Sequence, residues 1–145
     1  MNTNTPTLQN IIKNQEGQAM LEFAGCIVII VLLYLVIITL GLRVEDLSAI
    51  NKAARDGGRQ TAITSSLIDG ENKAKETAWA WGLDPGKFEV RISKSTYGSK
   101  NIVTCETYYR SSPFAALFPT ITGNTPVDEK ELYARSVFGW WDLEN

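Results

Sequence analysis

The twenty residues from Phe23 to Leu42 contain no charged side chain, and this run constrains the chain more than any other feature. Twenty helical residues span about 30 Å, the thickness of a bilayer's hydrocarbon core. The many β-branched residues do not favour a strand, because a lone segment in lipid must satisfy its backbone hydrogen bonds internally. The run therefore predicts a single-pass membrane protein held by one helix in the lipid bilayer.

Two other interpretations of the run fit less well. A buried core helix that is apolar on all sides needs a larger covering domain than the 103 residues that follow Leu42. A cleaved secretory signal has an apolar region of about 7–15 residues followed by small residues. Here the run is longer and is followed by Arg43, Glu45 and Asp46. The segment is therefore expected to stay in the protein.

The composition of the remaining chain excludes several classes of function. After Leu42 there are 13 Lys+Arg and 14 Asp+Glu, so a nucleic-acid partner is not expected. There is no His, and the chain lacks a Ser-x-x-Lys pair, a Cys-x-x-Cys pair and a Gly-rich phosphate loop. We expect no enzyme, no catalytic residue, no cofactor and no metal site. The mixed charges of residues 128–131 indicate a solvated turn.

Ahead of the run, residues 1–16 are polar and predict a short exposed tail. Glu22 lies directly against the apolar run, where a carboxylate must stay at headgroup level or find a partner. Gly17, with Glu22 five residues later and a hydrophobic helix after it, resembles the processing site of type IV prepilins. More narrowly, residues 17–24 and 50–59 are similar to TadE-like minor pilins and pseudopilins of the tight-adherence (Flp, type IVb) pilus system.

This resemblance covers about residues 17–62, and it implies a processing step and an assembly role. A prepilin peptidase would cut between Gly17 and Gln18 on the cytoplasmic side. Glu22, followed by Phe23, would then meet the free α-amino group of a neighbouring subunit during assembly. A facing ammonium offsets part of the cost of a carboxylate in low dielectric, and a glycine lets an extended chain approach a protease closely.

The resemblance also implies partners and a location. The partners are the prepilin peptidase, the major Flp pilin, other minor pilins and the pilus assembly platform in the membrane. The short N-terminus would be cytoplasmic, and the C-terminal domain would lie outside the membrane of a bacterial or archaeal cell or in the extracellular pilus. Basic residues are denser after the run than before it, which favours the opposite orientation, although long domains translocate largely regardless of charge.

The family often has a proline near the start of its helix, and here none lies between Pro6 and Pro85. The leader is also less basic than usual, with Lys13 as its one cation. Both departures bear on the subtype more than on the class.

Three regions are predicted: a leader at 1–17, a transmembrane helix (about 23–42) with an amphipathic extension at 18–64, and an extracytoplasmic domain at 65–145. The helix should continue past Leu42, because a set of residues falls near one face: Leu40, Val44, Leu47, Ile50, Ala54, Gly58 and Thr61. The pair Gly57-Gly58 predicts a kink or a close packing contact, and a helix end is the alternative.

The rest of the chain predicts an α+β, type IV pilin-like fold, with a long N-terminal helix, a short second helix and an antiparallel sheet of about three strands. The second helix is expected at about 71–81, capped by Asp69 or Gly70, with small residues on one face. Strands are expected at 88–92, 102–109 and 131–140, the first two forming a hairpin, and the stretch 111–126 should be irregular.

Two features and the function itself stay open. Cys105 is either a buried free thiol or the site of an intersubunit disulfide. The aromatic residues of segment 113–119 and of the C-terminus serve either the core or a partner surface. The leading prediction is a minor pilin that takes part in adhesion or secretion. The alternative is a single-pass anchored, extracytoplasmic ligand-binding or scaffolding protein, which needs no cut at Gly17 and tolerates Glu22→Ala.

Overall fold

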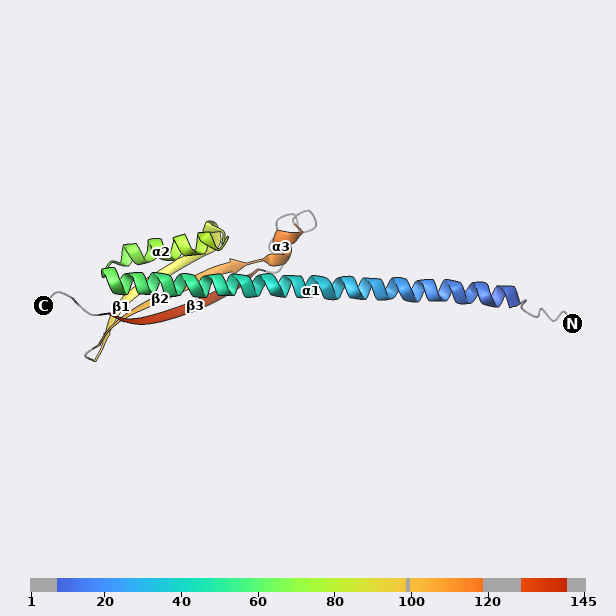
Figure 1. The fold of residues 1–145 in the computed structure, drawn as a ribbon, viewed down its shortest axis with the longest axis horizontal. Coiled ribbons are helices and arrows are strands. Elements are labelled where there is room, and N and C mark those ends of the chain that lie inside the picture. Colours follow the sequence, from blue (N-terminus) through green and yellow to red (C-terminus); the bar gives the residue numbers. More distant parts are fainter. Residues whose placement is uncertain (1–7, 99, 119–128, 141–145) are drawn as a thin grey trace. The chain divides into compact units, whose positions relative to one another are not determined.

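The computed structural model describes residues 8–98, 100–118 and 129–140, with side chains described from Gly17 onward except those of residues 116 and 140. It has two compact units, Met1–Ile38 and Thr39–Asn145. The elements in chain order are α1 (Leu8–Thr64), α2 (Leu67–Ala80), the 3-10 helix η1 (Pro85–Lys87), β1 (Phe88–Tyr97), β2 (Lys100–Ser111), α3 (Pro113–Leu117) and β3 (Lys130–Trp140) (Figure 1). The predicted α+β class is confirmed.

Helix α1 begins at Leu8, so the part of the predicted tail from Leu8 onward is helical. The pair Gly57-Gly58 lies inside the same helix, which rules out the alternative that the helix ends there. In the first unit, the side chains from Gly17 to Tyr34 are all exposed.

The three strands form one antiparallel sheet in the order β1-β2-β3. The predicted hairpin is confirmed: β1 and β2 pair from Phe88 opposite Tyr109 to Tyr97 opposite Lys100. Gly98 lies in the turn with φ of +63°, a conformation that favours glycine. Strand β3 pairs with the other edge of β2, so that Ser111 lies opposite Lys130.

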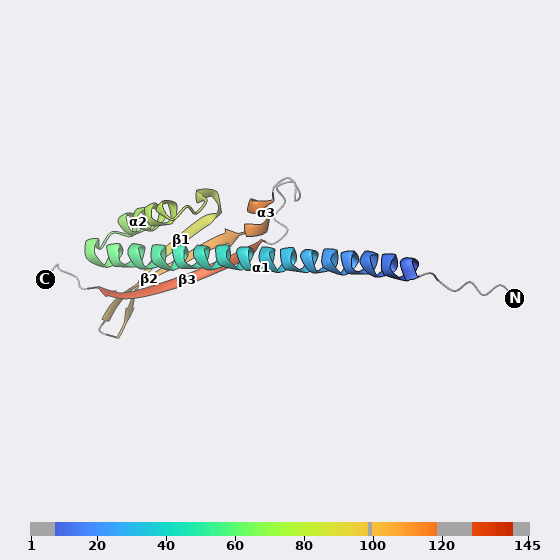
Figure 2. The same ribbon diagram turned by 45° about the vertical axis from the view of Figure 1, so that its right-hand side comes forward.

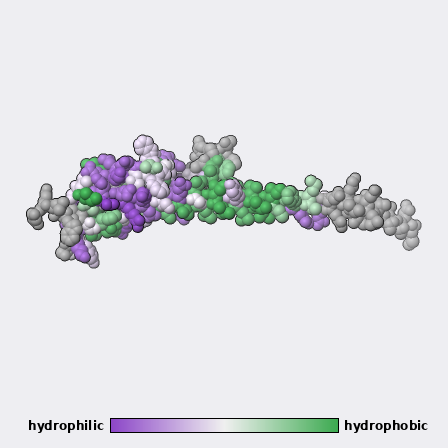
Figure 3. Space-filling view, viewed as in Figure 1, coloured by the Kyte–Doolittle hydropathy of each residue, from purple (hydrophilic) through white to green (hydrophobic). Residues whose placement is uncertain are grey.

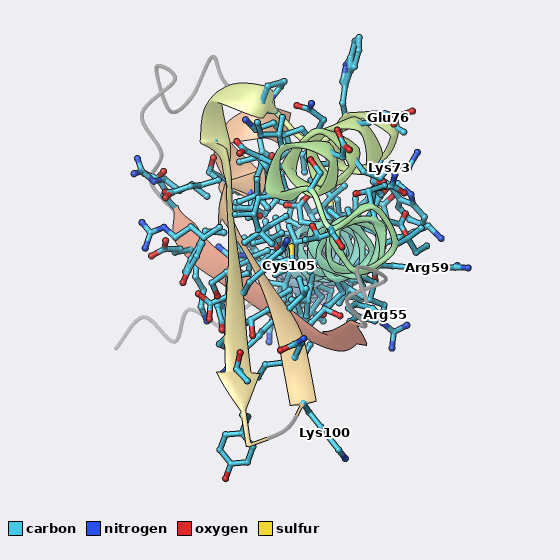
Figure 4. The ribbon with its side chains drawn as sticks, turned by 90° about the vertical axis from the view of Figure 1, so that its left-hand side faces the viewer. Arg55, Arg59, Lys73, Glu76, Lys100 and Cys105 are labelled. Carbon is cyan, nitrogen blue, oxygen red and sulfur yellow. The ribbon has the colours of Figure 1, made fainter. Side chains whose placement is uncertain are left out.

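Helices α1 and α2 cover the same face of this sheet (Figure 4). The apolar core between them is made largely of small side chains, and its buried members are Ala49, Ile50, Ala53, Ala54, Ala78, Leu83, Cys105, Tyr109 and Ala134. Most of the α1 residues in this core are alanines. Because such side chains are short, the helix backbone can approach the sheet and α2 closely.

Glycines bring the two helices into contact. A Cβ on Gly57 would lie 2.8 Å from the Cβ of Ala74 and 3.0 Å from the carbonyl oxygen of Gly70. A Cβ on Gly70 would overlap the Oγ1 of Thr61 and lie 2.8 Å from the carbonyl oxygen of Gly57. On the neighbouring side, a Cβ on Gly58 would lie 2.8 Å from the ring of Phe138. The predicted close packing contact at the glycine pair is therefore confirmed.

The predicted buried face of α1 is partly wrong. Ile50, Ala54, Gly58 and Thr61 are buried as expected, but Leu40, Val44 and Leu47 are exposed. The structure buries Ala49, Ala53 and Gly57 in their place. Helix α2 and the sheet approach α1 on adjacent sides, at Gly57 and Gly58. The buried face of α1 therefore lies where small residues permit close contact, not where large apolar residues occur.

Helix α2 starts earlier than predicted. Ser66, not Asp69 or Gly70, caps it, because its hydroxyl accepts a hydrogen bond of 3.2 Å from the backbone N–H of Asp69. Its buried residues are Gly70, Ala74, Thr77 and Ala78, which agrees with the prediction of small residues on one face. Trp81 lies just past the helix and is exposed.

The stretch expected to be irregular contains the short helix α3, which Pro113 opens. Within it Ala115 is buried, Phe114 is half-buried and Leu117 is exposed, so the segment serves both core and surface. At the C-terminal end, Phe138 is half-buried against Gly58. Residues 119–128 and Trp141 lie outside the described residues.

The contact between Gly57 and Gly70 predicts a stability effect. Gly70→Ala should lower the free energy of unfolding by about 1–3 kcal/mol, because the added methyl group overpacks the helix contact. Gly139→Ala is the matched control, since its Cβ would meet its nearest neighbour, the carbonyl oxygen of Asn101, at 3.9 Å. Denaturant unfolding of the full chain in detergent checks this, and equal stability of the two variants would contradict the described helix packing.

Candidate functional site

The predicted site residues lie on one short stretch of α1. Gly17, Gln18, Glu22 and Phe23 are all exposed. The side-chain Nε2 of Gln18 donates a hydrogen bond of 3.1 Å to Oε1 of Glu22, one helical turn further on. The i,i+4 spacing of an amide and a carboxylate was a signal for this contact that the sequence interpretation missed. In this chain the carboxylate thus has a neutral donor as its neighbour.

The fold does not explain why residue 17 is a glycine. No heavy atom lies within 4 Å of the position that a Cβ would occupy, and the residue lies inside α1. A glycine there costs the helix about 1 kcal/mol relative to alanine. The helix is therefore easier to unfold locally at this residue. Local unfolding is needed before a protease can bind the backbone in an extended form.

The stretch after Glu22 is unsuited to water. Phe23 is 68% exposed, and the large apolar residues that follow it are exposed on every side of the helix as far as Tyr34. Figure 3 shows this apolar surface along α1. By length and composition the helix is able to cross a membrane. An apolar surface of this extent marks a membrane or a partner site.

A second cluster lies on the face of the sheet that the helices do not cover. The hydroxyls of Tyr133 and Tyr108 donate to the carboxylate of Glu106 at 3.1 and 3.4 Å, and Arg135 approaches the same carboxylate at 3.8 Å. Partial burial, followed by the charge of Glu106, raises the pKa of both tyrosines. The cluster links β2 to β3 on an open surface, so we interpret it as a structural contact.

An apolar groove of about 500 Å³ lies between α2 and the start of β1. Its lining includes Trp79, Leu83 and Phe88, with Lys75 and Glu76 among the polar members. Both charges are already paired within α2: Lys75 lies 2.6 Å from Glu71, and Glu76 lies 2.9 Å from Lys73 (Figure 4). The groove offers a binding surface, and its paired charges offer no acid–base couple.

Cys105 lies in the interior of the second unit, beside Gly58. Burial raises the pKa of its thiol to about 11, although a hydrogen bond with the backbone of Gly58 opposes the shift. It is a buried free thiol in this structure, which favours the first of the two alternatives raised by the sequence. Within the described part of the chain, no group of three or more His, Cys, Asp or Glu residues could hold a metal ion.

The chain was compared with models of known protein families. The family model described as TadE-like protein matches residues 17–59. The match begins at the predicted processing motif, covers the apolar helix and ends at Arg59, so it confirms the resemblance drawn from residues 17–24 and 50–59. No curated protein and no solved structure matches the chain.

The environment of Cys105 predicts its reactivity. In a Cys26→Ser chain at pH 8, a maleimide should label Cys105 only after unfolding, because the thiol is buried and protonated. The thiol loses its proton near pH 9 in the unfolded chain, whereas in the folded chain its pKa is about 11. The free energy of unfolding should therefore fall as the pH rises from 9 to 11. Labelling followed by mass spectrometry checks this, with the denatured chain as control. Equally rapid labelling before and after unfolding would contradict it.

Proposed function

We propose that this chain, TadE-like over residues 17–59, is a minor pilin or pseudopilin of a tight-adherence pilus. A prepilin peptidase cuts it between Gly17 and Gln18, and the mature subunit enters the filament or assists its assembly. One observation carries the proposal: a glycine that the fold does not require lies five residues ahead of a carboxylate at the edge of a membrane-compatible helix.

The proposed mechanism depends on the charge next to Glu22. Before cleavage the peptide bond at residue 18 has no charge, and the side-chain amide of Gln18 is the donor that contacts Glu22. Cleavage creates an α-ammonium group at Gln18. The ammonium of a neighbouring subunit then meets the carboxylate of Glu22, and the paired charges are less costly in lipid than a lone carboxylate.

The two units then have separate tasks. Residues 23–42 hold the subunit in the bilayer before assembly and pack against other pilin subunits afterwards. The second unit, in which α2 packs on the C-terminal part of α1 through the contact of Gly57 with Gly70, is presented outside the membrane. The peptidase, the major Flp pilin, other minor pilins and the assembly platform are the proposed partners, and the N-terminus is cytoplasmic.

Processing is tested by intact mass. The chain extracted from membranes of cells that express the peptidase should have the mass of residues 18–145. Gly17→Leu should keep the full-length mass, because the open space around Gly17 allows the fold to accept the side chain while the peptidase cannot. Gly25→Leu, which is also in open space, is the control that should still be cut. A wild-type chain that retains Met1 would refute the cleavage.

The role of Glu22 is tested by assembly. Glu22→Ala should be inserted and cut normally, yet its incorporation into filaments should fall about a hundredfold or more, as removal of one partner of a low-dielectric ion pair costs about 3–5 kcal/mol. Glu45→Ala removes an exposed carboxylate beyond the apolar run and should assemble normally. Quantitative immunoblots of sheared filaments and membranes measure both. Equal incorporation of the two variants would contradict the role of Glu22.

The second candidate function is an anchored extracytoplasmic protein that binds a ligand or scaffolds an envelope complex. The groove beside Trp79 favours it, because it is an apolar concavity of about 500 Å³ with an exposed aromatic wall. This function requires no cut at Gly17 and no charge at Glu22. The two preceding experiments therefore separate it from the pilin.

A further inference from the structure

The short helix α3 is tied to α1 close to the end of the apolar run. Ser111, at the end of β2, donates a hydrogen bond of 2.5 Å to the carboxylate of Asp46 on α1. Lys87 donates one of 3.2 Å to the hydroxyl of Ser112, the residue before α3. Two independent contacts therefore fix the start of α3, and Figures 1 and 2 both show it beside this part of α1.

The position of Asp46 sets the level of α3 along the helix axis. Asp46 is four residues beyond Leu42, the last residue of the charge-free run, so it lies about 6 Å further along the axis. Each headgroup layer of a bilayer is about 5–7 Å thick, because the whole membrane measures about 40–45 Å and its core about 30 Å. With residues 23–42 in the hydrocarbon, which is part of the proposed function, α3 lies at headgroup level.

Apolar side chains are exposed at this same level. On α1, Leu40 is 58% and Val44 is 63% exposed, and on α3, Leu117 is 42% exposed. Phe118, which follows α3, is half-buried, and its ring contacts that of Phe114 at a tilt of 45° with centroids 5.1 Å apart. Leu40 and Val44 are two of the three α1 residues that the structure exposes although the sequence placed them on the helix's apolar face.

We propose that Leu40, Val44, Leu117 and Phe118, called here the interfacial set, insert into the boundary between headgroups and hydrocarbon. The bilayer is the occupant because the set is continuous with the charge-free run on the same helix, so lipid is present at this level whenever the run spans a membrane. Small apolar helices with Phe and Leu side chains are suited to this boundary. The domain is thereby held against the membrane at its α3 end.

Charge does not explain the docking. Four cations (Arg43, Lys87, Arg110 and Lys130) and four anions (Glu45, Asp46, Glu129 and Glu131) lie near this end of the domain. The mixture of signs offers no net attraction to anionic lipid. The insertion should therefore depend on apolar contact, with little change between neutral and anionic vesicles or between low and high salt.

Fluorescence quenching by lipid tests the insertion. The full chain, with Cys26→Ser, receives an environment-sensitive fluorophore at Leu117→Cys and is reconstituted into phosphatidylcholine vesicles that carry a quencher near the headgroup. The control is Tyr97→Cys, because Tyr97 is 82% exposed at the far end of the sheet. Quenching at position 117 should exceed that at position 97 by about threefold or more. In every variant, Cys105 should stay shielded from a maleimide, which reports that the domain is folded.

A third label, at Val31→Cys, separates this inference from the proposed function. It should be quenched by lipid that carries the quencher deep in the acyl chains. If position 31 is quenched and position 117 is quenched no more than position 97, the docking is wrong and the membrane span stands. If position 31 is not quenched, the span itself fails. The fluorophore at position 117 could also report an apolar environment that is lost when the protein is diluted in lipid. That result would mean contact with a second copy, which also overturns the docking.

Discussion

The carboxylate of Glu22 at the edge of twenty charge-free residues is the constraint on which the rest of the molecule depends. A lone charge at this boundary is costly in lipid, and the cost falls when an opposite charge faces it. The structure shows the amide of Gln18 at 3.1 Å, which donates a hydrogen bond and supplies no charge. Under the proposed function, cleavage after Gly17 converts this incompletely compensated carboxylate into one that selects a neighbouring subunit's N-terminus.

One helix meets two surroundings, and its composition changes accordingly. Large branched residues fill the part of α1 that suits lipid, whereas Ala53, Gly57 and Gly58 lie where the helix meets α2 and the sheet. Small residues let backbones come close, and the resulting contacts join the domain firmly to the C-terminal part of α1.

Features that depend on local pattern could be predicted from the sequence, and features that depend on distant contacts could not. The charge-free run, the glycine followed by Glu22 and the alternation in the first hairpin are each readable over a few residues. The buried face of α1 was not, because Leu40 and Val44 are apolar yet are exposed. The pairing of Glu106 with Tyr133 depends on a strand register set across the whole sheet. The cap at Ser66 had a local signal, Asp69 three residues later, that the interpretation overlooked.

The central claim is that an α-amino group at Gln18 faces the carboxylate of Glu22 on a neighbouring subunit. A zero-length carbodiimide cross-link tests it most directly, because it joins an amine and a carboxylate only when they are in contact. In membranes and sheared filaments of assembling cells, peptide mass spectrometry should find an amide bond between the N-terminus of Gln18 and the side chain of Glu22 in cross-linked pairs of subunits. A Glu22 that remains unmodified, or an N-terminus still blocked by the leader, would contradict the account.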